Sequence, residues 1–212
     1  MAAVLDSETP DSGAPVDLDT PVLFPKLLPW LLGICGTIGL IASFTLTVEK
    51  FELASDPDYV PSCSINPVVN CGSIMDTSQA AVFGFPNSLL GIAGFAALLA
   101  VAVMMGRTPQ RFVLIGLQVG LTAALVFVHW LIFQSFYRIG ALCPYCMAVW
   151  VAVVLAFWYV SLRTADHFAT TERARRVVDR LISVHSVIPV LWVLVVIALI
   201  TERFWYYWST LL

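Results

Sequence analysis

Five long apolar stretches constrain the fold of this chain more than any other feature of its sequence. None contains Asp, Glu, Lys or Arg, and each has the roughly 20 residues that a helix needs to cross a hydrocarbon core about 30 Å thick. They are Leu28–Val48, Asn87–Met105, Phe112–Phe133, Cys143–Leu162 and Leu181–Ile200. With 59% hydrophobic and 12% charged residues, the 212-residue chain lacks the charged surface of a soluble domain. The sequence therefore predicts an all-α integral membrane protein with five transmembrane helices.

Lys and Arg are distributed unevenly between the segments that join these stretches. If the N-terminus lies in the cytoplasm, eight basic residues fall on the inner side and three on the outer side. The inner residues are Lys26, Arg107, Arg111, Arg163, Arg173, Arg175, Arg176 and Arg180, and the outer residues are Lys50, Arg138 and Arg203. Because basic segments stay on the cytoplasmic side, we expect a cytoplasmic N-terminus. The basic residues are too dispersed to indicate nucleic-acid binding.

The remaining segments differ in character. Residues 1–26 form an acidic leader that we expect to be disordered in the cytoplasm, and this leader argues against reading the first stretch as a signal peptide. Residues 49–86 form a long outer loop, whose more apolar second half, Met75–Phe85, is expected to hold a short helix. Residues 163–180 form a basic cytoplasmic connector, and residues 181–212 hold the fifth helix and an aromatic outer tail.

Four cysteines form two pairs on the outer side of this topology. Cys63 and Cys71 lie in the outer loop, and Cys143 and Cys146 form a Cys-Pro-Tyr-Cys sequence at the start of the fourth stretch. Pro144 suits the first turn of a helix, so Cys146 should lie near unsatisfied backbone N–H groups that favour a thiolate. Disulfides form and persist on this side of the membrane. The pattern indicates thiol–disulfide exchange with an acceptor dissolved in the membrane.

Two other uses of these cysteines are weaker. Cys63 and Cys71 could form a purely structural disulfide, or all four sulfurs could bind a metal ion. The seven residues between Cys63 and Cys71 exceed the two to four that are usual in zinc sites, and four outward-facing thiolates would be prone to oxidation. Met147 rather than His follows Cys146, which disfavours covalent haem attachment. We therefore expect redox exchange and no metal site.

Three motifs carry a resemblance to a known family. They are Cys63-Ser-Ile-Asn-Pro-Val-Val-Asn-Cys71, Pro86-Asn-Ser-Leu-Leu-Gly91 and Leu142-Cys-Pro-Tyr-Cys146. Their spacing and order resemble the vitamin K epoxide reductase family over about residues 28–162. The resemblance implies a four-helix transmembrane bundle over residues 27–162, built around a quinone and capped by the outer loop, with the fifth helix added to it.

The resemblance is greatest to bacterial members, which oxidise thiols at the expense of a membrane quinone. It implies a quinone-dependent thiol oxidoreductase of the bacterial inner membrane that generates disulfides, with menaquinone or ubiquinone as cofactor. The reduced partner would be an exported DsbA-like or thioredoxin-like protein. Many bacterial members carry a fused thioredoxin-like domain, whereas this chain stops about a dozen residues after its fifth stretch. We therefore expect the partner to be a separate protein.

The resemblance also implies an order for the cysteines. Cys146 would lie next to the quinone, paired with Cys143 in the resting oxidised form. Cys71 would exchange with Cys143, and Cys63 would meet the reduced partner. Electrons would then run from the partner through the loop pair and the helix pair to the quinone.

Three further positions are implied as quinone contacts. Asn87 matches a family position that hydrogen-bonds a quinone carbonyl, and Ser88 matches a recurrent serine beside it. Trp150 stands where the animal enzymes have a tyrosine that also donates to the quinone. This departure makes reduction of vitamin K quinone or epoxide the alternative to disulfide generation. A disulfide-stapled membrane scaffold without turnover is the non-catalytic alternative.

Other candidates have competing structural explanations. His129, near the outer end of the third stretch, could take part in quinone protonation, but a satisfied interfacial histidine is favoured. Aromatic residues could wall a quinone ring, although such residues near an interface more often form a belt. These aromatic residues are Phe83, Phe85, Trp130 and Tyr145.

Four residues are assigned structural roles. Cys35, in the middle of the first stretch, is expected to be a small core residue. Gly91 and Gly94 are expected to permit close approach of helices. Asp76 is expected to cap the short helix of the outer loop.

Overall fold

The computed structural model describes residues 27–56, 58–105 and 111–210, so the leader expected at residues 1–26 lies outside the described residues. The described part is helical and contains no strand, apart from one isolated β-bridge. Four spans are long and apolar enough to cross a membrane, which confirms the predicted all-α membrane fold. They are α1 (Leu27–Ser55), α3 (Asn87–Met104), α4 with its continuation η2 (Arg111–Ile139 together) and α5 (Pro144–Phe168).

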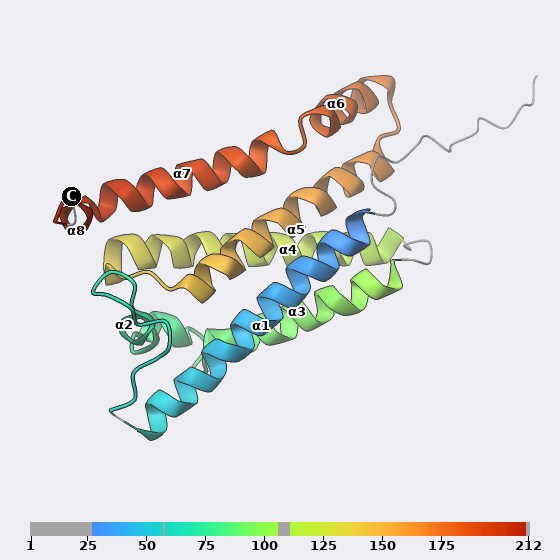
Figure 1. Cartoon of the computed structure of the whole chain (residues 1–212). Coiled ribbons are helices and arrows are strands. Elements are labelled where there is room, and N and C mark those ends of the chain that lie inside the picture. Colours follow the sequence, from blue (N-terminus) through green and yellow to red (C-terminus); the bar gives the residue numbers. More distant parts are fainter. Residues whose placement is uncertain (1–26, 57, 106–110, 211–212) are drawn as a thin grey trace, which may run out of the picture.

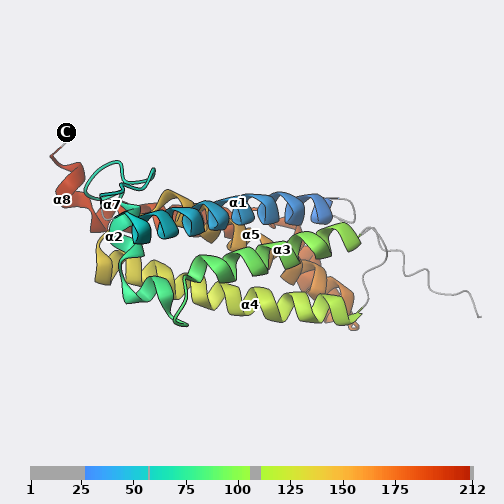
Figure 2. The ribbon, with the colours of Figure 1, turned by 90° about the horizontal axis from the view of Figure 1, so that it is seen from below.

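The spans form a bundle whose two ends differ. Helix α1 packs on α3 and α5, and α4 packs on α5 (Figures 1 and 2). The outer loop, which carries α2 (Cys71–Met75), lies at one end of the bundle, where α8 (Trp205–Trp208) also lies. Helix α6 (Glu172–Ser183) lies at the other end (Figure 1). Both cysteine pairs are therefore at the same end of the molecule, opposite the basic helix α6.

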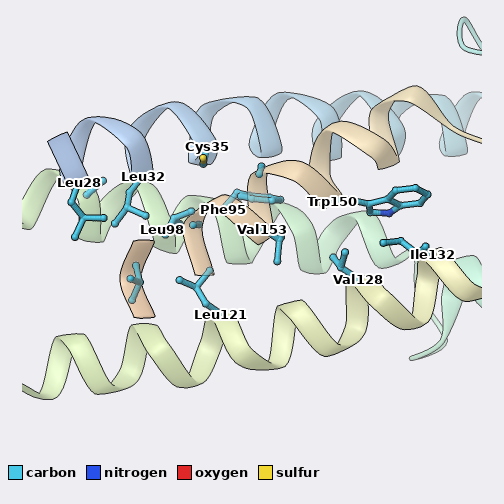
Figure 3. Close-up of a cluster of buried hydrophobic side chains, with 14 of the residues drawn as sticks. Leu28, Leu32, Cys35, Phe95, Leu98, Leu121, Val128, Ile132, Trp150 and Val153 are labelled. Atoms are coloured by element: carbon cyan, nitrogen blue, oxygen red, sulfur yellow. The ribbon is translucent and has the colours of Figure 1, made fainter. Parts of the chain in front are cut away.

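Apolar side chains from all four spans fill the interior of the bundle. Figure 3 shows Leu32 of α1, Phe95 of α3, Leu121 of α4 and Val153 of α5 pointing between the helices. Cys35 lies in this cluster with 4% of its surface exposed, as expected for a small core residue. The core continues to Trp150 at the end of the bundle that carries the loop.

Two glycines allow α1 to lie directly against α3. A Cβ atom at Gly39 would overlap the ring of Phe95, and one at Gly91 would overlap the side chain of Ser43. Small residues let helix backbones approach in this way. The prediction for Gly91 is confirmed, whereas the prediction for Gly94 is wrong because nothing lies within 4 Å of a Cβ built there.

Helix α1 continues well beyond the predicted end of the first stretch. The stretch was expected to end at Val48 with an outer loop beginning at residue 49, but the helix runs to Ser55. Residues 49–55 are Glu-Lys-Phe-Glu-Leu-Ala-Ser, most of which are good helix formers. Charges end an apolar stretch without ending the helix, so Glu49 stands on a rigid helix instead of a loop.

The predicted fifth helix is divided in two. The stretch Leu181–Ile200 begins at the end of α6, and α7 (Val187–Arg203) starts after a break, with an angle of 54° between the two helices. Pro189, in the first turn of α7, has no N–H to donate to the carbonyl of His185. The indole N–H of Trp158 donates to that carbonyl instead, at 2.7 Å. Only if the bent pair counts as one span does the described chain have five spans.

The short helices of the outer loop are capped differently from the prediction. Asn70 is the N-cap of α2, and its side chain accepts a hydrogen bond from the N–H of Ser73 at 3.1 Å. Asp76 lies at the C-terminal end of α2, and its carboxylate is 3.7 Å from Nζ of Lys50. Asp76 therefore does not cap a helix N-terminus. The apolar half of the loop holds one further short helix, η1 (Ser78–Ala81).

Candidate active site

A β-bridge joins the outer loop to the segment that leads into α5. The N–H of Leu142 donates to the carbonyl of Val68 at 2.7 Å, and the N–H of Asn70 donates to the carbonyl of Leu142 at 3.0 Å. The next residue along the loop is Cys71, and the next residue after Leu142 is Cys143. The bridge therefore brings the second cysteine of the loop pair beside the first cysteine of the helix pair.

Three cysteine sulfurs meet next to this bridge. Cys63 and Cys71 are joined by a disulfide bond, and Sγ of Cys71 lies 3.1 Å from Sγ of Cys143. All three cysteines are buried, with at most 4% of their surface exposed. Cys143 and Cys146 are free, whereas the resemblance implied a disulfide between them at rest. The loop pair is thus oxidised, and the helix pair is reduced and in contact with it.

Cys143 is the N-cap residue of α5 and lies just before that span. Its Sγ accepts a hydrogen bond from the N–H of Cys146 at 3.3 Å. The S–H of Cys146 lowers the pKa of Cys143, and the backbone N–H groups of Cys146 and Tyr145 lower it further, against the opposing effects of burial and of the Glu49 carboxylate. The sequence assigned these helix N-terminal groups to Cys146. They reach Cys143 instead, because an N-cap side chain accepts from the N–H three residues later.

Three sulfurs in such proximity also resemble part of a metal site. The Sγ atoms of Cys63, Cys71 and Cys143 lie within 4.8 Å of one another. However, a metal ligand must be a thiolate, and two of these sulfurs are bonded to each other. In this oxidation state the cluster offers a metal ion one thiolate, whereas it has every atom that disulfide exchange requires.

A hollow lies beside Cys146, between the outer loop and the ends of α4 and α5. Its empty volume is about 370 Å³, which includes the open space at its mouth. Its walls include Ile74, Thr77, Gln79 and Ala80 of the loop, Leu131, Gln134, Ser135 and Ile139 of α4 and η2, and Cys146 and Trp150 of α5. The surface of the hollow is mainly apolar.

A π-helical turn shapes one wall of this hollow. Helix α4 (Arg111–Phe133) continues as η2 (Gln134–Ile139), which ends at Gly140 in the left-handed conformation, with φ of 72°. The hydroxyl of Ser135 donates to the carbonyl of Ala141, and this bond ties the turn to the segment before Cys143. Such π-helical turns often occur at functional sites.

The comparison with protein families agrees with this site. A model described as the vitamin K epoxide reductase family matches residues 30–161, which is more than half of the chain. The chain belongs to this family. Because it also carries at least four apolar spans, it is a membrane oxidoreductase, and the family generally uses quinones. No curated protein sequence matches the chain.

Only one of the predicted quinone contacts lines the hollow of this family member. Trp150 is buried and forms part of the wall. Asn87 lies outside the wall, where its amide donates to the carbonyl of Gln79 at 2.6 Å and accepts from the N–H of Val82 at 3.1 Å. Ser88 accepts a hydrogen bond from the hydroxyl of Thr47 at 2.8 Å. Asn87 thus holds the loop segment that supplies Gln79 to the hollow.

His129 does not reach the hollow either. It lies on the outside of α4, where its Nε2 accepts a hydrogen bond from the indole N–H of Trp192 at 3.0 Å. Its Nδ1 lies 2.8 Å from the carbonyl of Leu125. Both ring nitrogens of His129 therefore have a partner, as in the structural role that the sequence favoured for this residue. The bond to Trp192 attaches α7 to α4.

The predicted aromatic wall lies mostly on the surface. Phe83 is 61% exposed, and its ring centroid is 6.3 Å from that of Phe85 and 6.4 Å from that of Phe127. Trp130 packs against Phe127, with ring centroids 5.9 Å apart. Tyr145 packs instead against the cysteine cluster. The exposed rings are placed as an interfacial belt would be.

The sequence did not identify several residues of the site. Gln79 and Gln134 line the hollow, but each lies in a stretch that gave no sign of binding. Glu49 lies beside Cys63, whereas the sequence predicted only that residue 49 would begin the outer loop. The sequence signal that could have identified Glu49 is its position as a charged residue directly after an apolar stretch. The two glutamines had no such signal, because only the folded loop and the π-helical turn bring them together.

Proposed function

We propose that this protein generates disulfides by oxidising an exported dithiol protein and passing the electrons to a membrane quinone. The observation that carries the proposal is the 3.1 Å contact between Sγ of Cys71 and Sγ of Cys143. This contact joins a loop pair that faces the aqueous end of the bundle to a helix pair that opens on the hollow. A structural disulfide alone would have no need of a second, reduced pair in contact with it.

The chemistry follows from thiol–disulfide exchange. The partner reduces the Cys63–Cys71 disulfide to two thiols and becomes oxidised. The thiolate of Cys71 then attacks Cys143 of an oxidised Cys143–Cys146 pair, and Cys146 leaves with the electron pair. Cys63 next attacks Cys71, which restores the loop disulfide and releases Cys143 as a thiolate. A loop disulfide beside a free Cys143, as in the structure, is the arrangement that this last step would leave.

A quinone head group is proposed to bind in this hollow. Its walls are mainly apolar and include Cys146, and the side-chain amides of Gln79 and Gln134 are proposed as hydrogen-bond donors to the quinone carbonyl oxygens. Donors in a site that excludes water stabilise charge that develops on oxygen. A bound quinone supplies a two-electron acceptor at this position. Trp150 is buried and lines the same hollow as Cys146.

The aqueous partner is proposed to contact the outer loop around Cys63. Cys63 itself is buried, but its neighbours Val60 and Ile65 are 70% and 73% exposed. Exposed apolar side chains beside a reactive pair suit a transient protein contact. Movement of the loop is then needed before a partner thiol reaches Cys63. We place this end of the bundle outside the bacterial inner membrane, because the basic helix α6 lies at the other end.

Turnover of cysteine variants tests this function. Purified protein in detergent should oxidise a reduced DsbA-like protein and reduce a ubiquinone or menaquinone analogue in equal amounts. We expect Cys143→Ala and Cys146→Ala to lose this turnover, because each removes one sulfur of the helix pair. Cys35→Ala is the matched control, since Cys35 is buried in the core away from the cluster. Turnover that survives in Cys143→Ala would overturn the proposal, and absence of turnover in the wild type would favour a scaffold.

A further inference from the structure

A buried carboxylate lies against the cysteine of the loop pair. Glu49, near the outer end of α1, has 4% of its surface exposed. Its Oε2 lies 3.4 Å from Sγ of Cys63. Because Cys63 is in a disulfide, this sulfur has no proton to donate, so the contact is not a hydrogen bond in this oxidation state. Once the disulfide is reduced, the S–H of Cys63 is within reach of the carboxylate.

The other oxygen of Glu49 is held by the loop. Oε1 accepts hydrogen bonds from the hydroxyl of Ser62 and from the N–H of Ser62, the latter at 3.2 Å. These two bonds fix the orientation of the carboxylate and leave Oε2 directed at Cys63. The neighbouring Lys50 points elsewhere, with Nζ donating to the carbonyl of Met75 at 2.7 Å. The two ion pairs in the described part of the chain do not involve Glu49.

A carboxylate in this position can act on one particular step. Restoring the loop disulfide requires Cys63 to attack Cys71 while Cys143 leaves. A thiol is a poor nucleophile compared with its thiolate, so removal of the Cys63 proton limits this attack. Glu49 is the carboxylate in contact with that sulfur, and it is therefore placed to accept the proton.

We propose that Glu49 is the general base for Cys63 when the loop disulfide is restored, a role that rests on the function proposed above. Oε2 takes the proton of the Cys63 thiol, and Sγ of Cys63 forms a bond to Sγ of Cys71. The Cys71–Cys143 bond breaks, and Cys143 leaves with the electron pair as a thiolate. The proton passes from Glu49 to water near the exposed hydroxyl of Ser62. No external oxidant is needed, because the mixed disulfide is converted into the loop disulfide.

The same site also stabilises the leaving group of this step, which is the thiolate of Cys143. The S–H of Cys146 and the nearby backbone N–H groups stabilise the thiolate of Cys143. A stabilised leaving thiolate departs faster from a disulfide. A base at one end of the exchange and a stabilised leaving group at the other direct the Cys71 sulfur away from Cys143 and towards Cys63.

Replacement of Glu49 by glutamine separates this role from a structural one. Glu49→Gln keeps the size of the side chain and an oxygen that can accept from Ser62, but it cannot take up a proton. We expect turnover to fall by about 10²-fold, the lower end of the usual contribution of a general base. During turnover the Cys71–Cys143 mixed disulfide should accumulate, as measured by mass spectrometry of acid-quenched samples. Glu49→Asp, which keeps a carboxylate, should recover part of the rate.

Glu52→Gln is the matched control. Glu52 lies on the same helix, close to Glu49 in sequence, but it is exposed. Its variant should turn over like the wild type and should not accumulate the mixed disulfide. A loss of loop structure in Glu49→Gln would lower the amount of mixed disulfide instead of raising it, because Cys71 would no longer lie beside Cys143.

The results of these experiments decide whether Glu49 is the general base for Cys63. Accumulation in Glu49→Gln but not in Glu52→Gln supports the base. Unchanged turnover in Glu49→Gln, or slow turnover without accumulation of the mixed disulfide, overturns the role of Glu49 as a base. The proposed function still stands in that case, provided that the wild-type protein is active. If Glu49→Gln does not fold, the decay of the mixed disulfide in the wild type is compared in light and heavy water. Slower decay in heavy water supports proton transfer at this step, and equal decay overturns it. Inactive wild-type protein would instead refute the proposed function itself.

Discussion

At the scale of single residues, the site assigns different properties to cysteines that look equivalent in sequence. Cys143 and Cys146 share one Cys-x-x-Cys motif, but only Cys143 occupies the N-cap and accepts the N–H of Cys146. Cys71 and Cys63 share one disulfide, but only Cys71 contacts Cys143, and only Cys63 contacts a carboxylate. In the proposed exchange, these contacts would give the reaction its direction.

The lowered pKa of Cys143 predicts a pH dependence at this scale. Because its pKa is lowered, Cys143 should be a thiolate at pH values where an ordinary cysteine, with a pKa of about 8.5, is still protonated. The thiolate should be lost as the pH falls through the lowered value. Cys146→Ala should raise the pKa of Cys143, because it removes the S–H donor that is the main cause of the shift.

The ultraviolet absorbance of the thiolate measures this titration. Subtracting the curve of Cys143→Ala from that of the wild type isolates Cys143, and Cys35→Ala provides the control. A Cys143 that titrates in the ordinary thiol range, with no change in Cys146→Ala, would contradict the role assigned to the hydrogen bond.

At the scale of elements, the positions of the cysteines depend on contacts between helices distant in sequence. The approach of α1 to α3 at Gly39 places the outer end of α1, and with it Glu49, under the loop. Helix α7 is attached to the same end of the bundle, because Nε of Arg203 donates to the carbonyl of Phe136 in η2 at 2.9 Å. Phe204 is buried beside Phe136, with ring centroids 6.4 Å apart. The fifth helix thus supports the π-helical turn that lines the hollow.

Gly39→Ala should weaken the contact between α1 and α3. The added methyl group would overlap the ring of Phe95, and such overpacking costs about 1–3 kcal/mol of the free energy of unfolding. Gly33→Ala is the control on the same helix, because nothing lies within 4 Å of its Cβ. Alanine in place of an unrestricted helical glycine should be neutral or stabilising by up to about 1 kcal/mol. Thermal unfolding in detergent compares the two variants, and equal melting temperatures would contradict the packing described.

At the scale of the whole molecule, the cysteine pairs and the most basic helix lie at opposite ends of the bundle. Both cysteine pairs and the hollow lie at the end that carries α2, and the basic helix α6 lies at the other end (Figure 1). The first turn of α6 contains Glu172, and Thr171 is the N-cap residue of this helix. The hydroxyl of Thr171 accepts a hydrogen bond from the N–H of Ala174 at 3.2 Å. A basic helix at one end of an apolar bundle is typical of the cytoplasmic side of a membrane.

Labelling of intact cells tests this orientation. Asp58→Cys places a thiol on the exposed outer loop, and Arg173→Cys places one on the exposed face of α6. A thiol reagent that does not cross membranes should label the first variant in intact cells and the second only after the cells are opened. The reverse pattern would contradict the proposed outward position of the cysteine pairs.

The sequence by itself determined the class of the protein and singled out the cysteines that are proposed to react. Apolar stretches of about 20 residues specify membrane helices through length and composition alone, and the pairs of cysteines stand out because the chain has few other reactive groups. Gly91 was also predictable from its small size. These features are local, so the residue types and their spacing are sufficient to recognise them.

Only the tertiary structure decided how these residues work together. The β-bridge at Leu142 sets the contact between Cys71 and Cys143, which are distant in sequence. The break between α6 and α7 depends on Pro189 and on the indole of Trp158, and the hollow depends on a π-helical turn. Glu49 became part of the site because α1 continues past its apolar stretch and packs under the loop. Contacts of this kind arise from packing between distant segments, which the pattern of a single segment does not contain.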